Sequence, residues 1–130
     1  MATILAVDDE PLTCRLLEIS LSRLGHEVLT TTSGLAGIEL VQQVRPSLVI
    51  LDLVLPDTDG LEMLQRIREI APQTAVVIFT AWGSELIERK ASSLGARAFL
   101  QKGRVPGLLR STVSQILETQ AVVASNKANE

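Results

Sequence analysis

The chain has 130 residues and 46% of them are apolar, so it can form one domain with a buried core. Its 15 acidic and 12 basic residues give a formal net charge of -3, and the absence of a basic stripe argues against direct binding of nucleic acid. The N-terminal apolar run stops at Asp8, which is too short for a signal peptide or a membrane span, so we expect a cytoplasmic protein without membrane contact.

Short apolar runs alternate with segments of helical periodicity along the whole chain. In chain order the predicted elements are a strand over 4–7, a helix over 11–24, a strand over 27–31, a helix over 34–44, a strand over 48–51, a helix over 61–70, a strand over 75–79, a helix over 85–94, a strand over 98–100 and a helix over 106–118. Residues 120–130 are small and polar, and we interpret them as a flexible tail or the start of a linker that follows a domain over 1–119.

Five strand–helix repeats predict an α/β fold. Parallel strands need crossover connections, which are almost always right-handed. The run over 48–51 is entirely apolar, as expected for a central parallel strand that is buried on both faces. The sequence therefore predicts a doubly wound, five-stranded parallel sheet with five helices on its two faces.

Polar residues follow four of the predicted strands. Asp8 and Asp9 come after the first strand, Asp52 ends the third, Thr80 follows the fourth and Lys102 follows the fifth. In open α/β sheets, ligands bind beyond the carboxyl ends of the strands. We therefore expect three carboxylates, one hydroxyl and one ammonium group to meet at a single edge of the sheet.

This combination of groups predicts phosphoryl chemistry with a divalent cation. Three carboxylates and one ammonium leave a charge of minus two, which one divalent ion would balance. Ligands that are all oxygen atoms favour a hard ion, Mg²⁺ first. An aspartate can then act as the nucleophile toward a phosphoryl group, while the metal and the ammonium neutralise the charge of the transferring oxygens.

Several short motifs occur in an order that resembles the response-regulator receiver family of two-component signalling. The resemblance covers roughly residues 3–119. It rests on Val7-Asp8-Asp9-Glu10, Leu51-Asp52, Leu55-Pro56-Asp57, Asp59-Gly60, Thr80-Ala81, Gly95-Ala96 and Phe99-Leu100-Gln101-Lys102. It implies a flavodoxin-like fold with the strand order 2-1-3-4-5.

The resemblance also implies a role for each residue at the predicted site. Asp52 is similar in position to the phosphoacceptor of the family. Asp9 would bind Mg²⁺ directly, and Asp8 would help either directly or through a water molecule. Asp52 and the backbone carbonyl of Val54 would be the further protein ligands. Lys102 would contact the bound phosphoryl group.

Phosphorylation would then change the protein's surface. The resemblance implies that Thr80 and Phe99 form the switch, although the position of Phe99 equally fits a plain core residue. The last two helices and the last strand would carry the effect to partners, and that face could also form a homodimer. The phosphoryl donor would be a sensor histidine kinase or a phosphotransfer protein. An apolar stripe of Leu12, Leu16 and Ile19 on the first helix is a candidate surface for it.

Three other functions remain open from the sequence. A Mg²⁺-dependent phosphohydrolase with an aspartyl nucleophile would carry a second acid two residues after Asp52, where this chain has Val54. A binder of a flavin phosphate would need a phosphate-cradling loop in place of Asp8-Asp9-Glu10. The third is a receiver that serves as a constitutive interaction module without phosphorylation.

Overall fold

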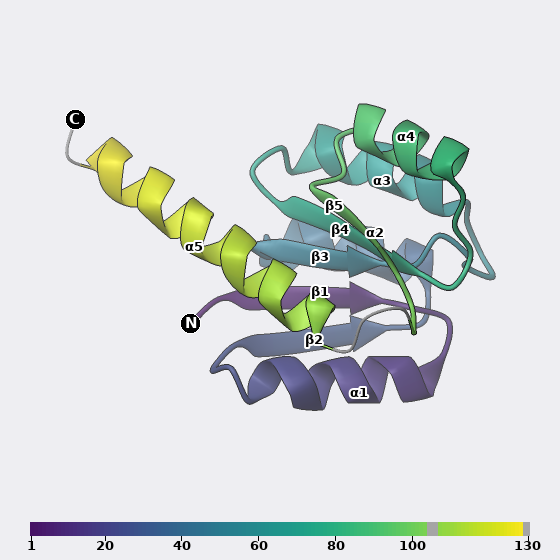
Figure 1. Cartoon of the computed structure of the whole chain (residues 1–130), viewed down its shortest axis with the longest axis horizontal. Helices are drawn as coiled ribbons and strands as arrows, with labels where there is room; N and C mark the ends of the chain where they lie inside the picture. Colours follow the sequence, from purple (N-terminus) through teal and green to yellow (C-terminus); the bar gives the residue numbers. More distant parts are fainter. Residues whose placement is uncertain (104–106, 129–130) are drawn as a thin grey trace.

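The computed structural model describes residues 1–103 and 107–128 (Figure 1). Five strands form one parallel sheet in the order β2-β1-β3-β4-β5. The strands are β1 (Thr3–Val7), β2 (Glu27–Thr31), β3 (Leu48–Leu51), β4 (Ala75–Thr80) and β5 (Ala98–Gln101). The helices are α1 (Pro11–Ser22), α2 (Gly34–Val44), α3 (Gly60–Ile70), α4 (Glu85–Ser93) and α5 (Leu108–Ala128). The predicted fold class and strand order are confirmed.

Helices cover both faces of the sheet, because alternate residues of each inner strand point to opposite faces. On one face, strand residues pack against α2, α3 and α4; this core includes Leu5, Val7, Val49, Leu51, Ile38, Val41, Met63, Leu64, Ile67 and Ala91. On the other face they pack against α1 and α5; this core includes Ile4, Ala6, Leu48, Ile50, Leu17, Leu21, Val113 and Ile116. The entirely apolar β3 therefore supplies side chains to two cores.

The register of the sheet aligns the carboxyl ends of the inner strands. Val7 of β1 pairs with Leu51 of β3, and the backbone N–H of Asp52 donates to the carbonyl of Val7 over 2.9 Å. The N–H of Lys102 likewise donates to the carbonyl of Thr80 over 2.8 Å. The residues that directly follow β1, β3 and β5 thus lie at one edge of the sheet.

Local capping fixes where the helices on the α2–α4 face begin. The side chains of Ser33, Asp59 and Ser84 accept hydrogen bonds from the first-turn N–H groups of α2, α3 and α4 respectively, which satisfies donors that a helix cannot pair internally. No helix in the described part of the chain has both the length and the hydropathy that a membrane span requires.

The last helix differs from the prediction. Its expected first residue, Pro106, lies outside the described residues. The predicted end at 118 is wrong, because α5 continues to Ala128. The interpretation of 120–130 as a flexible tail or the start of a linker stays a prediction. The amide of Gln120 donates to the carbonyl of Ser47 over 3.0 Å, and this tertiary contact holds the helix against the sheet beyond the predicted end. The predicted domain boundary at residue 119 stays a prediction.

Candidate functional site

The carboxylate of Asp52 lies at the carboxyl end of β3 and has both oxygens occupied. Its Oδ1 accepts hydrogen bonds from the hydroxyl of Thr80 over 2.8 Å and from the backbone N–H of Val54 over 3.1 Å. Its Oδ2 lies 3.0 Å from Nζ of Lys102. Asp52 is only 4% exposed, and a buried carboxylate of this kind needs such partners to compensate for lost hydration.

Lys102 connects the predicted acids to one another. From the end of β5 its Nζ reaches Oδ2 of Asp8 over 2.7 Å, Oδ2 of Asp52 over 3.0 Å and Oε1 of Glu10 over 3.4 Å. Burial lowers the pKa of Lys102, but the hydrogen bonds to Asp8 and Asp52 outweigh burial and raise the pKa above its ordinary value. The side chain therefore remains a cation at physiological pH and offsets two buried negative charges.

Asp8 and Asp9 lie with Glu10 at the carboxyl end of β1. One carboxylate oxygen from each of the three residues lies within 4.8 Å of the others; Asp8 is buried, whereas Asp9 and Glu10 are exposed. The donors are all carboxylate oxygens. Asp52 lies outside this group of three and is linked to Asp8 through the shared ammonium of Lys102. This donor set fits a hard divalent cation such as Mg²⁺.

Thr80 and Phe99 occupy neighbouring strands behind the acids. Thr80 is the last residue of β4, is fully buried, and accepts the backbone N–H of Trp82 over 3.2 Å besides donating to Asp52. Phe99 in β5 is half-buried against the core on the α2–α4 face. A Cβ placed on Gly83 would lie 3.0 Å from its ring, so the ring packs against the loop that begins just after Thr80.

The sequence patterns give no role of their own to two residues of this region, Glu10 and Asp57. Glu10 ends the motif Val7-Asp8-Asp9-Glu10, and it pairs with Lys102 and belongs to the acidic cluster. Its position three residues after β1 is the signal that indicates this role. Asp57 belongs to the motif Leu55-Pro56-Asp57, which gives it no role of its own, and it accepts hydrogen bonds from the start of α2. Val54 is 49% exposed, and its side chain is apolar where a hydrolase of this type would carry its second acid.

Because Asp8 is buried, its carboxyl group makes the stability of the fold depend on pH. Burial raises the pKa of this carboxyl above its ordinary value of 3.8, and the hydrogen bonds from Lys102 and from the backbone N–H of Glu10 only partly oppose the effect. A group whose pKa is higher in the folded protein adds stability below its unfolded pKa. That stability is lost as the pH rises through the folded pKa.

We therefore expect Asp8→Asn to raise the free energy of unfolding of the metal-free protein at neutral pH, because Lys102 keeps Asp52 as its buried partner. The difference from the wild type should narrow as the pH falls below 3.8, because Asp8 is then protonated in both states. Urea unfolding in EDTA at a series of pH values measures this. A variant that is less stable than the wild type at neutral pH would contradict the expectation.

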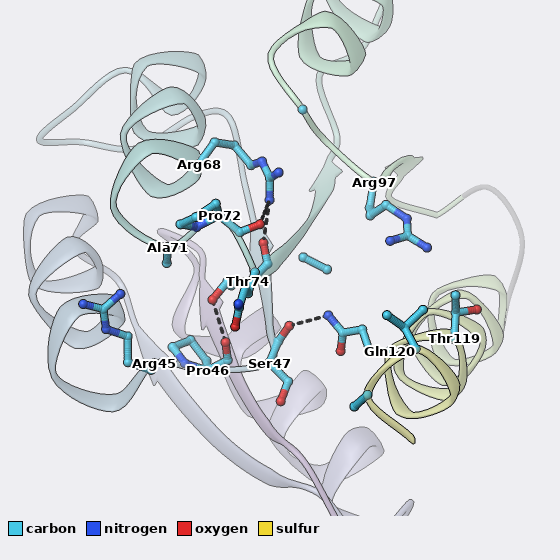
Figure 2. Close-up of a pocket in the computed structure, with 15 residues that line it drawn as sticks. Arg45, Pro46, Ser47, Arg68, Ala71, Pro72, Thr74, Arg97, Thr119 and Gln120 are labelled. Atoms are coloured by element: carbon cyan, nitrogen blue, oxygen red, sulfur yellow. Dashed lines mark hydrogen bonds between the residues drawn. The ribbon is translucent and has the colours of Figure 1, made fainter. Parts of the chain in front are cut away.

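The opposite edge of the sheet carries a hollow of about 790 Å³, bordered by Arg45, Arg68 and Arg97 (Figure 2). Two of these arginines already bind the backbone. Nη1 of Arg45 donates to the carbonyl of Ile70 over 2.8 Å, and Nη1 of Arg68 donates to the carbonyls of Pro72 and Thr74 over 2.9 Å each. Their contacts brace the turn between α3 and β4, and the predicted site lies at the other edge.

Comparison with known proteins gives consistent matches over nearly the whole chain. The family model of the response regulator receiver domain matches residues 4–123. The transcriptional regulatory protein PhoP of Bacillus subtilis, named for alkaline phosphatase synthesis, is 30% identical over 93% of this chain, which spans 50% of PhoP. The regulator GlrR of Escherichia coli is 31% identical over 99% of this chain, which spans 29% of GlrR. The chain thus spans half or less of these relatives.

Solved structures are similar as well. The signal receiver domain of a LuxO repressor protein from Vibrio parahaemolyticus has a TM-score of 0.89 and 27% identity, with 95% of each chain covered. NtrX from Brucella abortus has a TM-score of 0.87 and 30% identity over 97% of this chain and 29% of its own.

Proposed function

The chain belongs to the family of response regulator receiver domains, and from this premise we propose that it is a phosphorylation-dependent signalling switch with Asp52 as its acceptor. The phosphoryl group would come from the phosphohistidine of a sensor histidine kinase or a phosphotransfer protein. The phosphorus–nitrogen bond breaks as a bond forms between phosphorus and a carboxylate oxygen of Asp52. The product is an acyl phosphate that serves as a signal.

The observation that supports this proposal most directly is the set of partners around Asp52. Lys102 lies 3.0 Å from one carboxylate oxygen and the Thr80 hydroxyl lies 2.8 Å from the other. An ammonium and a hydroxyl so placed would stabilise negative charge on the oxygens of an incoming phosphoryl group. Neither group could serve this purpose if Asp52 pointed into the core.

Mg²⁺ is the cofactor that we propose for this reaction. Asp8, Asp9, Asp52 and the backbone carbonyl of Val54 would hold it, with Glu10 close by. When bound, the ion neutralises charge on the transferring phosphoryl oxygens. Lys102 would then exchange its contact with Asp8 for a contact with the phosphoryl group.

We propose that Thr80 and Phe99 convert phosphorylation into a change of surface. A phosphoryl group on Asp52 offers the Thr80 hydroxyl a new acceptor in place of the carboxylate. The backbone N–H of Trp82 bonds to the same hydroxyl, and the Phe99 ring lies against Gly83. Movement of Thr80 would therefore reach the loop before α4 and the ring of Phe99 together.

The helix α1 carries an exposed apolar stripe that is suited to contact a partner protein. Leu12, Leu16 and Ile19 are 69%, 58% and 39% exposed, and their spacing places them on one stripe of the helix. An exposed apolar stripe beside an acidic site is suited to a helical partner that delivers a phosphoryl group. We propose it as the docking surface for the kinase or phosphotransfer protein.

Intact mass spectrometry after incubation with acetyl phosphate tests the proposal. With Mg²⁺ we expect the mass to increase by one phosphoryl group per chain, and with EDTA we expect no increase. Sustained release of inorganic phosphate far in excess of protein would indicate a phosphohydrolase instead. No adduct under any Mg²⁺ concentration would favour a constitutive interaction module and overturn the proposal.

A further inference from the structure

The segment between β3 and α3, residues 53–59, connects Asp52 to the rest of the fold, and we name it the acceptor loop. It carries Val54, whose carbonyl is a proposed ligand of Mg²⁺. Two contacts hold the loop from within: Val54 pairs with Asp59 in an isolated antiparallel bridge, and the N–H of Val54 donates to Asp52. Neither contact ties the outer part of the loop to a neighbouring element.

Asp57 connects the outer part of the acceptor loop to α2. Its Oδ2 accepts a hydrogen bond from the hydroxyl of Ser33 over 2.6 Å and another from the N–H of Leu35 over 3.2 Å, and its Oδ1 accepts from the N–H of Gly34 over 2.9 Å. All three donors belong to the start of α2, 22 to 24 residues earlier in the chain. The unpaired N–H groups of a helix start favour a negative group, and Asp57 uses both of its oxygens there.

The fit between the acceptor loop and α2 is close. A Cβ on Gly34 would overlap Cγ2 of Thr58 and lie 3.2 Å from Cδ1 of Leu55. Ser33 is fully used as well, because its hydroxyl accepts the N–H of Ala36 while it donates to Asp57. The three hydrogen bonds of the exposed Asp57 thus lie at the rim of a close contact between the acceptor loop and α2.

We propose that Asp57 is a positioning residue for the metal site: it clamps the acceptor loop onto α2 so that the Val54 carbonyl is already in place when Mg²⁺ binds. This inference rests on the proposed function. A ligand on an unclamped loop must be ordered at the moment of binding, which weakens binding. Partners that orient metal ligands typically change metal affinity by about 10- to 100-fold when they are removed.

Titration with Mg²⁺ alone tests the clamp. Trp82 is the only tryptophan of the chain, and its backbone N–H bonds to Thr80, so its fluorescence can report Mg²⁺ binding. We expect Asp57→Ala to raise the Kd for Mg²⁺ about tenfold. Asp57→Asn should raise it less, since one oxygen remains to accept a hydrogen bond.

Two further variants separate the clamp from charge. Glu62→Gln removes one exposed negative charge from the first turn of α3 and should leave the Kd close to that of the wild type. Ser33→Ala keeps every charge but removes the shortest bond to Asp57, and it should weaken Mg²⁺ binding. If Asp57→Ala does not fold, Asp57→Asn and Ser33→Ala decide the question.

The outcomes distinguish this inference from the proposed function. If the wild type binds Mg²⁺ and takes up a phosphoryl group, but the Asp57 variants bind Mg²⁺ no more weakly than Glu62→Gln, only the clamp is overturned. If the wild type neither binds Mg²⁺ nor takes up a phosphoryl group, the proposed function fails and the clamp fails with it. The clamp is supported if the Asp57 and Ser33 variants bind Mg²⁺ more weakly than the wild type while Glu62→Gln does not.

Discussion

Asp52→Asn is expected to abolish the phosphoryl adduct that acetyl phosphate and Mg²⁺ give with the wild type. The substitution keeps the shape of the side chain and an oxygen for Thr80, but an amide is not a nucleophile toward phosphorus. Intact mass measured side by side on the two proteins checks the result. We expect no detectable adduct on the variant at a time when the wild type carries one.

Asp8 is the second candidate for the phosphoacceptor. It is as buried as Asp52 and lies even closer to Lys102, at 2.7 Å against 3.0 Å. Only Asp52, however, also receives the hydroxyl of Thr80. Asp8→Asn should therefore still form some adduct, at a lower rate because one metal ligand is lost, and Glu62→Gln should behave as the wild type. An undiminished adduct on Asp52→Asn would contradict the assignment.

The elements that could be predicted from sequence are those with a local signal. The run of four apolar residues at Leu48–Leu51 has the pattern of a strand with two covered faces, and the structure buries all four. Once parallel strands are predicted, position alone places Asp52, Thr80 and Lys102 at one edge. No contact had to be known in advance, because the carboxyl ends of parallel strands coincide.

What could not be predicted depends on contacts between distant segments. The helix α5 runs past its predicted end, and Gln120 in this added part contacts Ser47, 73 residues earlier, which no local pattern indicates. The hydrogen bonds between Asp57 and α2 depend on how closely two connections approach each other, and the motif Leu55-Pro56-Asp57 gives no indication of that contact. The sequence around Phe99 is compatible both with a core residue and with a switch residue. In the structure its ring is half-buried and lies beside Gly83.

Lys102→Met is expected to lower the free energy of unfolding of the metal-free protein by about 3–5 kcal/mol, the usual cost of removing one partner from a buried ion pair. Methionine keeps much of the volume but leaves Asp8 and Asp52 without their shared cation, and these residues are only 2% and 4% exposed. Two neighbouring carboxylates would repel, and one would bind a proton more readily. The exposed contact with Glu10 contributes little to this cost.

Mg²⁺ should recover part of the stability lost in Lys102→Met, because the ion supplies positive charge to the same acids and any ligand that binds the folded state stabilises it. Thermal unfolding in EDTA and in Mg²⁺ measures both effects. Lys90→Met is the matched control: Lys90 is exposed near the end of α4, and its loss should leave the Tm nearly unchanged in either buffer. A Tm for Lys102→Met equal to that of the wild type in EDTA would show that the two buried acids do not need the lysine. The count of three carboxylates and one ammonium, which predicts a divalent cation at this site, would then not describe its charge balance.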